Sequence, residues 1–319
     1  MYIDMDQWST GIIEKKERDV FPVLYFPCLS LADMGIVETM NDGKKMACAM
    51  KKIIEKFPSM NAIATGMDLT VDAEAFGASV TFKGNEAPSI REPLVDSAEE
   101  VRALKVPDVH SGRVDVFLEA VKEAGKLIPD RPVLGGQLGP FSLAANLMEV
   151  QKALKATRKD PDTLRLLLDK ATEFLIARAK AYKEAGANGI FLAEPTAGLL
   201  SPKQHREFSA VYVKKIVEAV QDSGFYIILH NCGYVTNMVP DMINTGCKGF
   251  HFGNAVDMRE ILPQIPPEVL VYGNIDPSSD FTNGTAEGIY KKPRSCCGLW
   301  KNTPISFSPR AVTFLRWRR

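Results

Sequence analysis

The chain has 319 residues, of which 45% are hydrophobic and 24% are charged, which suits one large domain or two ordinary ones with an ample core. No apolar run reaches the length of a membrane span, and the N-terminus lacks a basic-then-apolar signal, so we expect a soluble cytoplasmic protein with no membrane partner. The six cysteines (28, 48, 232, 247, 296 and 297) form no regular framework, which argues against a disulfide scaffold and leaves metal or redox chemistry for any special cysteine.

The formal net charge of zero hides an uneven distribution. Residues 291–319 contain eight Lys or Arg and no Asp or Glu, which leaves 31 of the 39 basic residues against all 39 acidic ones in 1–290, a net charge of −8. An acidic body with a short basic tail is one pattern of a nucleic-acid-binding protein. The sequence of residues 291–319 favours a different explanation for these basic residues, which is given below, and we expect no nucleic-acid partner.

Short apolar runs alternate with helical patterns along most of the chain. Strands are predicted at 20–26, 61–65, 131–137, 189–193, 225–229, 249–252 and 268–272, with a small hairpin at 80–85. Helices are predicted between them, including 97–104, 113–127, 162–185, 202–220 and one around 237–244.

This alternation is typical of a parallel sheet that is buried on both faces. We therefore predict an α/β fold, a (β/α)8 TIM barrel over residues 1–290, with the eighth strand lost or replaced by an atypical tail at 291–319. A doubly wound open sheet is the alternative. The absence of a G-x-G-x-x-G string after the first strand argues against a dinucleotide-binding version of it.

Active residues of a barrel lie at the carboxyl ends of its strands. In this chain those positions are rich in carboxylates, amides and metal-ligand types, which is more than loop composition alone would give: Asp68, Gln137, Gly139, Pro140, Phe141, Glu194, His230, Cys232, Asn254 and Asp276. This concentration of polar side chains favours a catalytic site over a structural explanation.

One stretch, 226–233, ends an apolar run on His230-Asn-Cys232-Gly. Strand side chains alternate between faces, so His230 and Cys232 point the same way. An imidazole and a thiolate side by side can hold two of the four positions around zinc. The alternative for these two residues is a core histidine and an inert buried cysteine. We expect His251 to be a core histidine, and His110 and His205 to lie at the surface without a functional role.

Four motifs in order resemble the uroporphyrinogen decarboxylase superfamily: Asp68 in Met-Asp-Leu-Thr, Gly139-Pro-Phe-Ser142, His230-x-Cys232-Gly and Gly273-Asn-Ile-Asp-Pro277. The similarity runs from about residue 20 to about residue 290, and it is strongest to the methylcobamide:coenzyme M methyltransferase branch. The decarboxylase hallmark, an Arg-x-x-Gly-Arg string after the first strand, is missing, since residues 26–31 read Phe-Pro-Cys-Leu-Ser-Leu. A guanidinium fork is the natural partner for the propionates of a tetrapyrrole.

The resemblance implies a zinc-dependent methyltransferase that moves a methyl group from a methyl-corrinoid, carried by a small corrinoid-binding protein, to a small thiol. Zinc would lie on His230, Cys232 and a later cysteine. Asp68 and Glu194 would be catalytic carboxylates, and Gln137, Gly139, Pro140, Phe141, Asn254 and Asp276 would bind substrate. Glu194 is equally consistent with a zinc ligand, a partner for His230, or a solvated carboxylate. A uroporphyrinogen decarboxylase and a catalytically inactive truncated barrel are the functional alternatives.

The family pattern needs the later cysteine in Ser-Gly-Cys followed by prolines, and the printed tail has no such string. In a shifted reading frame, each codon consists of the last base of one codon and the first two bases of the next. The genetic code then allows residues 301–316 to be replaced by Glu-Tyr-Pro-Asn-Phe-Ile-Leu-Ser-Ser-Gly-Cys-Asp-Ile-Pro-Pro. We therefore interpret the basic tail as the product of a frameshift near residue 291. Residues 303–308 are expected to fill the eighth strand position in the printed chain.

Overall fold

The computed structural model describes residues 3–15, 19–84, 86–273, 275–285 and 287–288. Its helices are α1 (Met5–Glu14), α2 (Ile36–Met40), α3 (Gly43–Lys56), α4 (Val71–Ala75), α5 (Ala98–Ala103), α6 (Val114–Leu127), α7 (Pro140–Met148), α8 (Val150–Lys159), α9 (Pro161–Glu184), α10 (Pro202–His205), α11 (Val211–Val220), α12 (Val239–Ile243) and α13 (Met258–Ile261). Its strands are β1 (Ile63–Ala64), β2 (Val80–Thr81), β3 (Ser89–Ile90), β4 (Val133–Leu138), β5 (Gly189–Ala193), β6 (Tyr226–Asn231), β7 (Gly249–Phe252) and β8 (Leu270–Tyr272).

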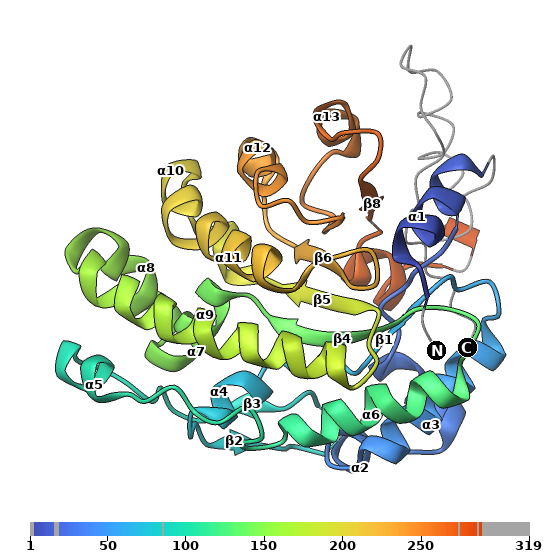
Figure 1. Cartoon of the computed structure of the whole chain (residues 1–319), viewed down its shortest axis with the longest axis horizontal. Coiled ribbons are helices and arrows are strands. Elements are labelled where there is room, and N and C mark those ends of the chain that lie inside the picture. Colours follow the sequence, from blue (N-terminus) through green and yellow to red (C-terminus); the bar gives the residue numbers. More distant parts are fainter. Residues whose placement is uncertain (1–2, 16–18, 85, 274, 286, 289–319) are drawn as a thin grey trace.

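Within the described residues the main sheet has six strands in the order β1-β4-β5-β6-β7-β8, and every neighbouring pair is parallel. Helices lie between consecutive strands and cover the sheet from outside, with α6 and α9 against β4 and α3 against β1 (Figure 1). The predicted α/β fold with a parallel sheet is therefore confirmed. The predicted hairpin is β2 paired with β3, and its loop is longer than a two-residue turn.

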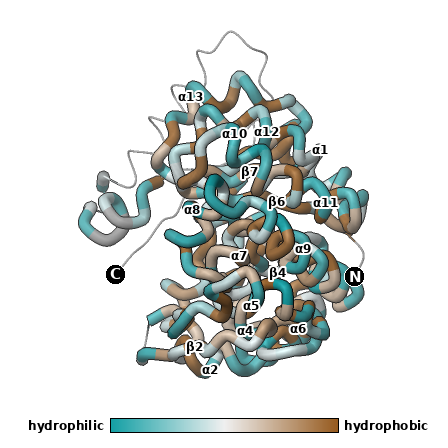
Figure 2. The backbone as a smooth tube through the Cα atoms, turned by 90° about the vertical axis from the view of Figure 1, so that its left-hand side faces the viewer, coloured by the Kyte–Doolittle hydropathy of each residue, from teal (hydrophilic) through white to brown (hydrophobic). Residues whose placement is uncertain are grey.

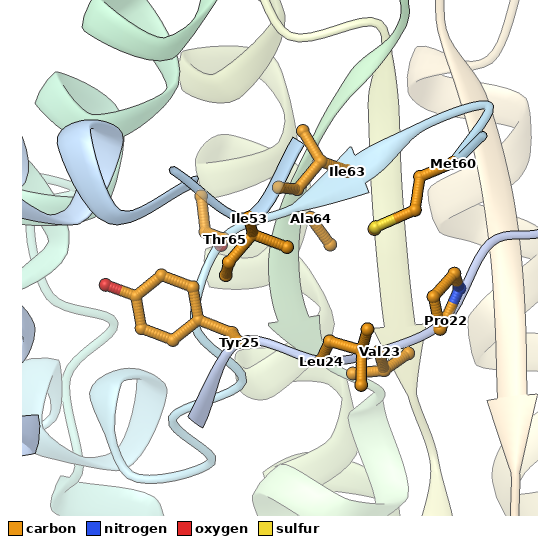
Figure 3. Close-up of a pocket in the computed structure, with 9 residues that line it drawn as sticks. All are labelled: Pro22, Val23, Leu24, Tyr25, Ile53, Met60, Ile63, Ala64 and Thr65. Atoms are coloured by element: carbon orange, nitrogen blue, oxygen red, sulfur yellow. The ribbon is translucent and has the colours of Figure 1, made fainter. Parts of the chain in front are cut away.

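The first predicted strand, 20–26, is not a strand. Only Val20 makes a parallel bridge, to Met60, and residues from Phe26 to Ala32 form a 3₁₀-helix. Figure 3 shows residues 22–25 running beside β1, and together with Ile53 and Ile63 they line a cavity of about 10 Å³. Apolar packing rather than a hydrogen-bond ladder holds this segment at the sheet edge, because Pro22 cannot donate a backbone hydrogen bond.

The long predicted helix is α9, which begins and ends where its capping residues predict. Asp160 accepts a hydrogen bond from the backbone N–H of Thr163, Pro161 occupies the first turn, and Gly186 follows the helix with φ of +95°. Figure 2 shows hydrophobic and hydrophilic residues alternating along α6 and α11, as expected for helices with one face on the sheet.

The inner face of the sheet carries its own apolar cluster, separate from the core under the helices. Phe21, Leu134, Phe191, Ile228 and Tyr272 belong to it, and all five are buried. Helix α1 packs at one end of this interior. There the hydroxyl of Tyr226 donates to the Asp6 carboxylate and shares a hydrogen bond with the hydroxyl of Ser9. The backbone N–H of Met5 donates to the carbonyl of Ser223 at 2.7 Å. The carboxyl ends of the strands lie at the other end.

The tail expected at 291–319, with the eighth strand at 303–308, lies outside the described residues. Closure of the sheet into a full barrel stays a prediction for that reason. Among the helices that the structure does describe, none combines the length and the apolar character needed to cross a bilayer.

Candidate active site

A cavity of about 220 Å³ lies at the carboxyl ends of β6, β7 and β8. The side that carries chemistry is formed by His230 and Cys232 from the end of β6 and by His251 from β7. The remaining lining comes from Val23, Phe252, Gly253, Asn254, Gly273, Ile275 and Pro277. The two residues of the predicted His-x-Cys pair therefore face one cavity, as strand alternation predicts.

His230 and His251 are partners in the parallel register of β6 and β7. Their ring centroids are 4.7 Å apart, and their Nδ1 atoms lie 2.8 Å from each other. Nδ1 of His230 is also 3.2 Å from the backbone carbonyl oxygen of His251. Phe191 stacks on His230 at 5.5 Å between centroids, and Tyr272 stacks on His251 at 6.4 Å. Aromatic packing thus fixes both imidazole planes.

Burial keeps both imidazoles neutral. It lowers the pKa of His230 to about 4, against a small opposing effect of the hydrogen bond to the His251 carbonyl. Burial, and after it the proximity of His230, lowers the pKa of His251 well below its ordinary value. A neutral imidazole is the form that binds a metal ion, so His230 is in the ligand-competent state at neutral pH.

Cys232 is exposed to solvent and held by its neighbours in the chain. The Asn231 side chain, buried on the opposite face, donates to the carbonyl of Glu194 at 2.6 Å and accepts from the N–H of Gly233 at 2.8 Å. The backbone at Gly253 passes so close that an added Cβ would lie 2.6 Å from Cα of Cys232. The turn that carries the Cys232 thiol is therefore held in place by the hydrogen bonds of Asn231 and by the close approach of Gly253.

Glu194 is buried, and its carboxylate faces the start of α7. It accepts hydrogen bonds from the backbone N–H groups of Phe141 (2.8 Å) and Ser142 (2.9 Å) and from the hydroxyl of Ser209 (3.1 Å). Ser209 reaches it from a π-helical turn, Arg206–Ala210, inside the predicted 202–220 helix. A Cβ at Gly139 would lie 2.5 Å from the Glu194 carboxyl carbon, so glycine is needed for this approach. These contacts tie β5 to α7.

Glu194 should make stability depend on pH. Burial raises its pKa, although the donors from Ser142, Phe141 and Ser209 oppose the shift. Between the ordinary glutamate pKa and the raised one, the folded state holds more protons than the unfolded state, so the free energy of unfolding falls as pH rises through that window. We expect Glu194→Gln to flatten this slope in urea titrations over the mildly acidic range. An unchanged slope in the variant would contradict the assignment.

Asp68 belongs to a buried ion-pair cluster. Its carboxylate accepts from Arg113 Nη1 at 2.6 Å and from the Thr70 hydroxyl at 2.6 Å, and Arg113 also donates to Glu74 at 2.7 Å. The Asp68 side chain has no exposed area and does not line the cavity described above. The structure therefore gives this carboxylate a role in holding the segment after β1.

The predicted substrate-binding residues divide into two groups. Gln137 points away from the interior and donates to the Leu175 carbonyl of α9 at 3.0 Å, while Gly139, Pro140 and Phe141 form the start of α7 beside Glu194. Asn254 lines the cavity. Asp276 accepts from the backbone N–H of Ser279 at 3.0 Å, and its neighbours Ile275 and Pro277 line the cavity.

Three features were missed or misplaced from the sequence. His251 was expected to be an ordinary core histidine, but it shares the cavity with His230. His205 was expected at the surface, yet it is buried, and burial lowers its pKa to about 4. Arg113 was taken only as the start of a helix. His251 lies two residues after Gly249, the first residue of the strand, and strand side chains alternate between the two faces of a sheet. This spacing could have predicted that His251 lies on the inner face, with Phe250 and Phe252 on the outer one.

A family model described as uroporphyrinogen decarboxylase (URO-D) matches residues 24–305 of the chain. The chain belongs to this family. The expected superfamily is thus confirmed, and it is a family of enzymes.

Relatives in both branches of the family are found. A methylcobamide:CoM methyltransferase MtbA of Methanosarcina acetivorans is 29% identical over 318 residues, which cover 89% of this chain and 90% of the relative. A methylcobamide:CoM methyltransferase MtaA of Methanosarcina barkeri is 30% identical over 310 residues, 89% of this chain and 91% of the relative. A uroporphyrinogen decarboxylase of Hydrogenovibrio crunogenus is 28% identical over 247 residues, 74% of this chain and 69% of the relative.

Solved structures agree with the fold. A methyltransferase from Methanosarcina mazei superimposes with a TM-score of 0.84 at 23% identity, covering 99% of this chain and 95% of that one. A B12-independent methionine synthase from Shewanella superimposes with a TM-score of 0.53 at 14% identity, covering 85% and 81%.

The donor set fits a zinc ion in part. His230 offers one neutral imidazole nitrogen and Cys232 an accessible thiol, both on the same cavity. Nitrogen and sulfur are the donors that zinc prefers. Among the described residues no group of three His, Cys, Asp or Glu side chains is placed to hold a metal, so a further ligand must come from elsewhere in the chain or from the substrate.

Proposed function

We propose that this protein is a zinc-dependent methyltransferase that moves a methyl group from a methyl-corrinoid protein to a thiol. The observation that carries the proposal is the placement of His230 and Cys232 on one cavity at the carboxyl end of the sheet. The methyltransferase relatives support it, since the longest matches among those described above are named methylcobamide:CoM methyltransferases.

In this proposal the chain's own residues bind and orient the reactants. His230 and Cys232 would hold the zinc, which would favour the thiolate form of a coordinated thiol. The clamp of Asn231 on Glu194 and Gly233 keeps the two donors at a fixed separation. The thiolate attacks the methyl carbon, the sulfur–carbon bond forms, and the cobalt–carbon bond breaks with its electron pair left on cobalt.

The shape of the cavity suits a small acceptor. A volume of about 220 Å³ is enough for a short thiol, and the larger methyl-corrinoid would be presented at the mouth by its own carrier protein. Asn254 and the segment around Asp276 lie at the cavity and are our candidates for orienting the thiol. The acceptor of the relatives, coenzyme M, is the thiol that we would try first.

A uroporphyrinogen decarboxylase is the second candidate, because relatives of that name match the chain. The absence of arginine from residues 26–31 argues against it. We expect the zinc-supplemented protein to demethylate methylcob(III)alamin when coenzyme M is added, seen as the loss of the methyl-corrinoid absorbance, and to leave uroporphyrinogen intact.

The methyl-transfer assay and the uroporphyrinogen assay use the same zinc-supplemented protein. A methyl-transfer reaction without the thiol is the control. Coproporphyrinogen formation at an ordinary turnover would replace the methyltransferase proposal by the decarboxylase one. A protein inactive in both arms would support the third possibility, an incomplete barrel. Restoring the reading frame at 291–319, so that the tail contains Ser-Gly-Cys followed by prolines, should then recover methyl transfer.

A further inference from the structure

His251 has no role in the proposed chemistry so far, yet it makes the shortest polar contact of His230. The register of β6 and β7 places the two side chains directly opposite each other. Phe191 lies against both rings, at 5.5 Å from His230 and 5.3 Å from His251. The relative position of the two imidazoles is therefore fixed by the strand register and by the contacts of both rings with Phe191.

The hydrogen on this contact can be assigned from the acceptors. Nδ1 of His230 faces two atoms, Nδ1 of His251 at 2.8 Å and the carbonyl oxygen of His251 at 3.2 Å. A carbonyl oxygen only accepts, so that contact requires a hydrogen on Nδ1 of His230. The same hydrogen satisfies the ring nitrogen of His251, which then accepts. The reverse assignment would leave the His230 lone pair facing an oxygen lone pair.

We infer that His251 is a positioning residue, which fixes His230 as the Nδ1–H tautomer and so leaves Nε2 as the nitrogen that binds metal. Nδ1 is occupied by His251, and Nε2 of His230 has no hydrogen-bond partner among the described residues. Metal-binding histidines depend on such a contact at the second nitrogen, which orients the ring and raises its basicity. Here a neutral imidazole and a backbone carbonyl take the place usually held by a carboxylate.

The first test needs no metal. The chain contains four histidines, so a protein labelled with ¹⁵N-histidine gives few signals, and substitution of each histidine assigns them. Long-range ¹H–¹⁵N correlation spectra of the metal-free full chain distinguish a ring nitrogen that carries hydrogen from one that does not. We expect His230 to carry hydrogen on Nδ1 and His251 on Nε2. A His230 that carries it on Nε2 overturns the inference.

The second test rests on the proposed zinc site and compares variants that differ in one acceptor. His251→Phe keeps a ring of similar size and removes the Nδ1 acceptor, so that only the backbone carbonyl of residue 251 remains, whereas the side-chain oxygen of His251→Asn can replace Nδ1. We expect the Phe variant to weaken zinc binding by about 10-fold or more, measured by competition with a chelator, and the Asn variant to stay within about 3-fold of the parent. His110→Asn, at an exposed histidine paired with Asp115, is the control and should leave zinc affinity unchanged.

The two tests separate this inference from the proposed function. Parent-like zinc affinity in His251→Phe would overturn the positioning role even if methyl transfer is found. A frame-restored protein that binds no zinc would refute the proposed function, while the spectra of the metal-free protein would still decide the tautomer. Circular dichroism of each variant shows whether a loss of affinity follows from unfolding.

Discussion

Replacing either donor of the His-x-Cys pair should remove zinc and thiol methylation together. In a frame-restored protein, we expect His230→Ala and Cys232→Ala each to lower zinc affinity and the methylation rate by more than about 100-fold, because loss of a ligand exceeds the 10–100-fold cost of losing a residue that only supports one. Zinc is measured by atomic emission after dialysis, and methylation by loss of the methyl-corrinoid absorbance.

Cys48→Ala is the matched control for the cysteine variant. Cys48 lies in α3, away from the cavity, and is only partly exposed, so its loss should change neither quantity. Glu194→Gln should weaken the site without emptying it, since the Glu194 carboxylate contacts α7 rather than the cavity. Either donor variant retaining stoichiometric zinc and full activity would show that the open metal site is wrongly placed.

Breaking the buried ion pair between Asp72 and Arg178 should have the largest effect on stability. The Arg178 guanidinium contacts Asp72 Oδ1, both side chains are only 1% exposed, and Asp72 Oδ2 also accepts from the backbone N–H of Leu138 at 3.0 Å. Burial alone would lower the pKa of Arg178, but the Asp72 charge raises it above its ordinary value. Removing one partner therefore leaves an uncompensated buried charge.

We expect Asp72→Ala to lower the free energy of unfolding by about 3–5 kcal/mol in urea titrations. Asp169→Ala, which breaks the exposed pair with Lys215, should cost less than about 1 kcal/mol and serves as the control. The double variant Asp72→Leu/Arg178→Met should be more stable than Asp72→Ala, because it leaves no charge behind. Equal losses from Asp72→Ala and the control would refute the structural role of this pair.

The alternation of apolar runs and helical patterns was sufficient to predict most of the fold. Strands β1 and β4 to β8 all lie on or within two residues of their predicted positions, since each is a short apolar run ended by Gly, Glu or Asn. The failure at 20–26 has a physical cause. Its side chains are apolar and become buried, which is what the pattern encodes, but Pro22 and the turn into the 3₁₀-helix after Tyr25 prevent a ladder.

The site was predicted less completely, because its polar contacts join residues far apart in sequence. Strand alternation placed His230 and Cys232 on one face. Nothing local to His251 reveals that it pairs with a histidine 21 residues earlier, since that depends on the register between β6 and β7. The same holds for Glu194, whose partners Phe141 and Ser142 precede it by 53 and 52 residues.

We propose above that His230 and Cys232 would hold a zinc ion, and that this ion would supply a binding position for the acceptor thiol. X-ray absorption at the zinc K-edge of the zinc-loaded protein, recorded before and after addition of coenzyme M, tests this most directly. We predict that the thiol adds one sulfur neighbour at about 2.3 Å from zinc. Two results would contradict this proposal. The first is a zinc environment that does not change at saturating thiol, and the second is a Cys232→Ala variant whose zinc has as many sulfur neighbours as that of the parent protein.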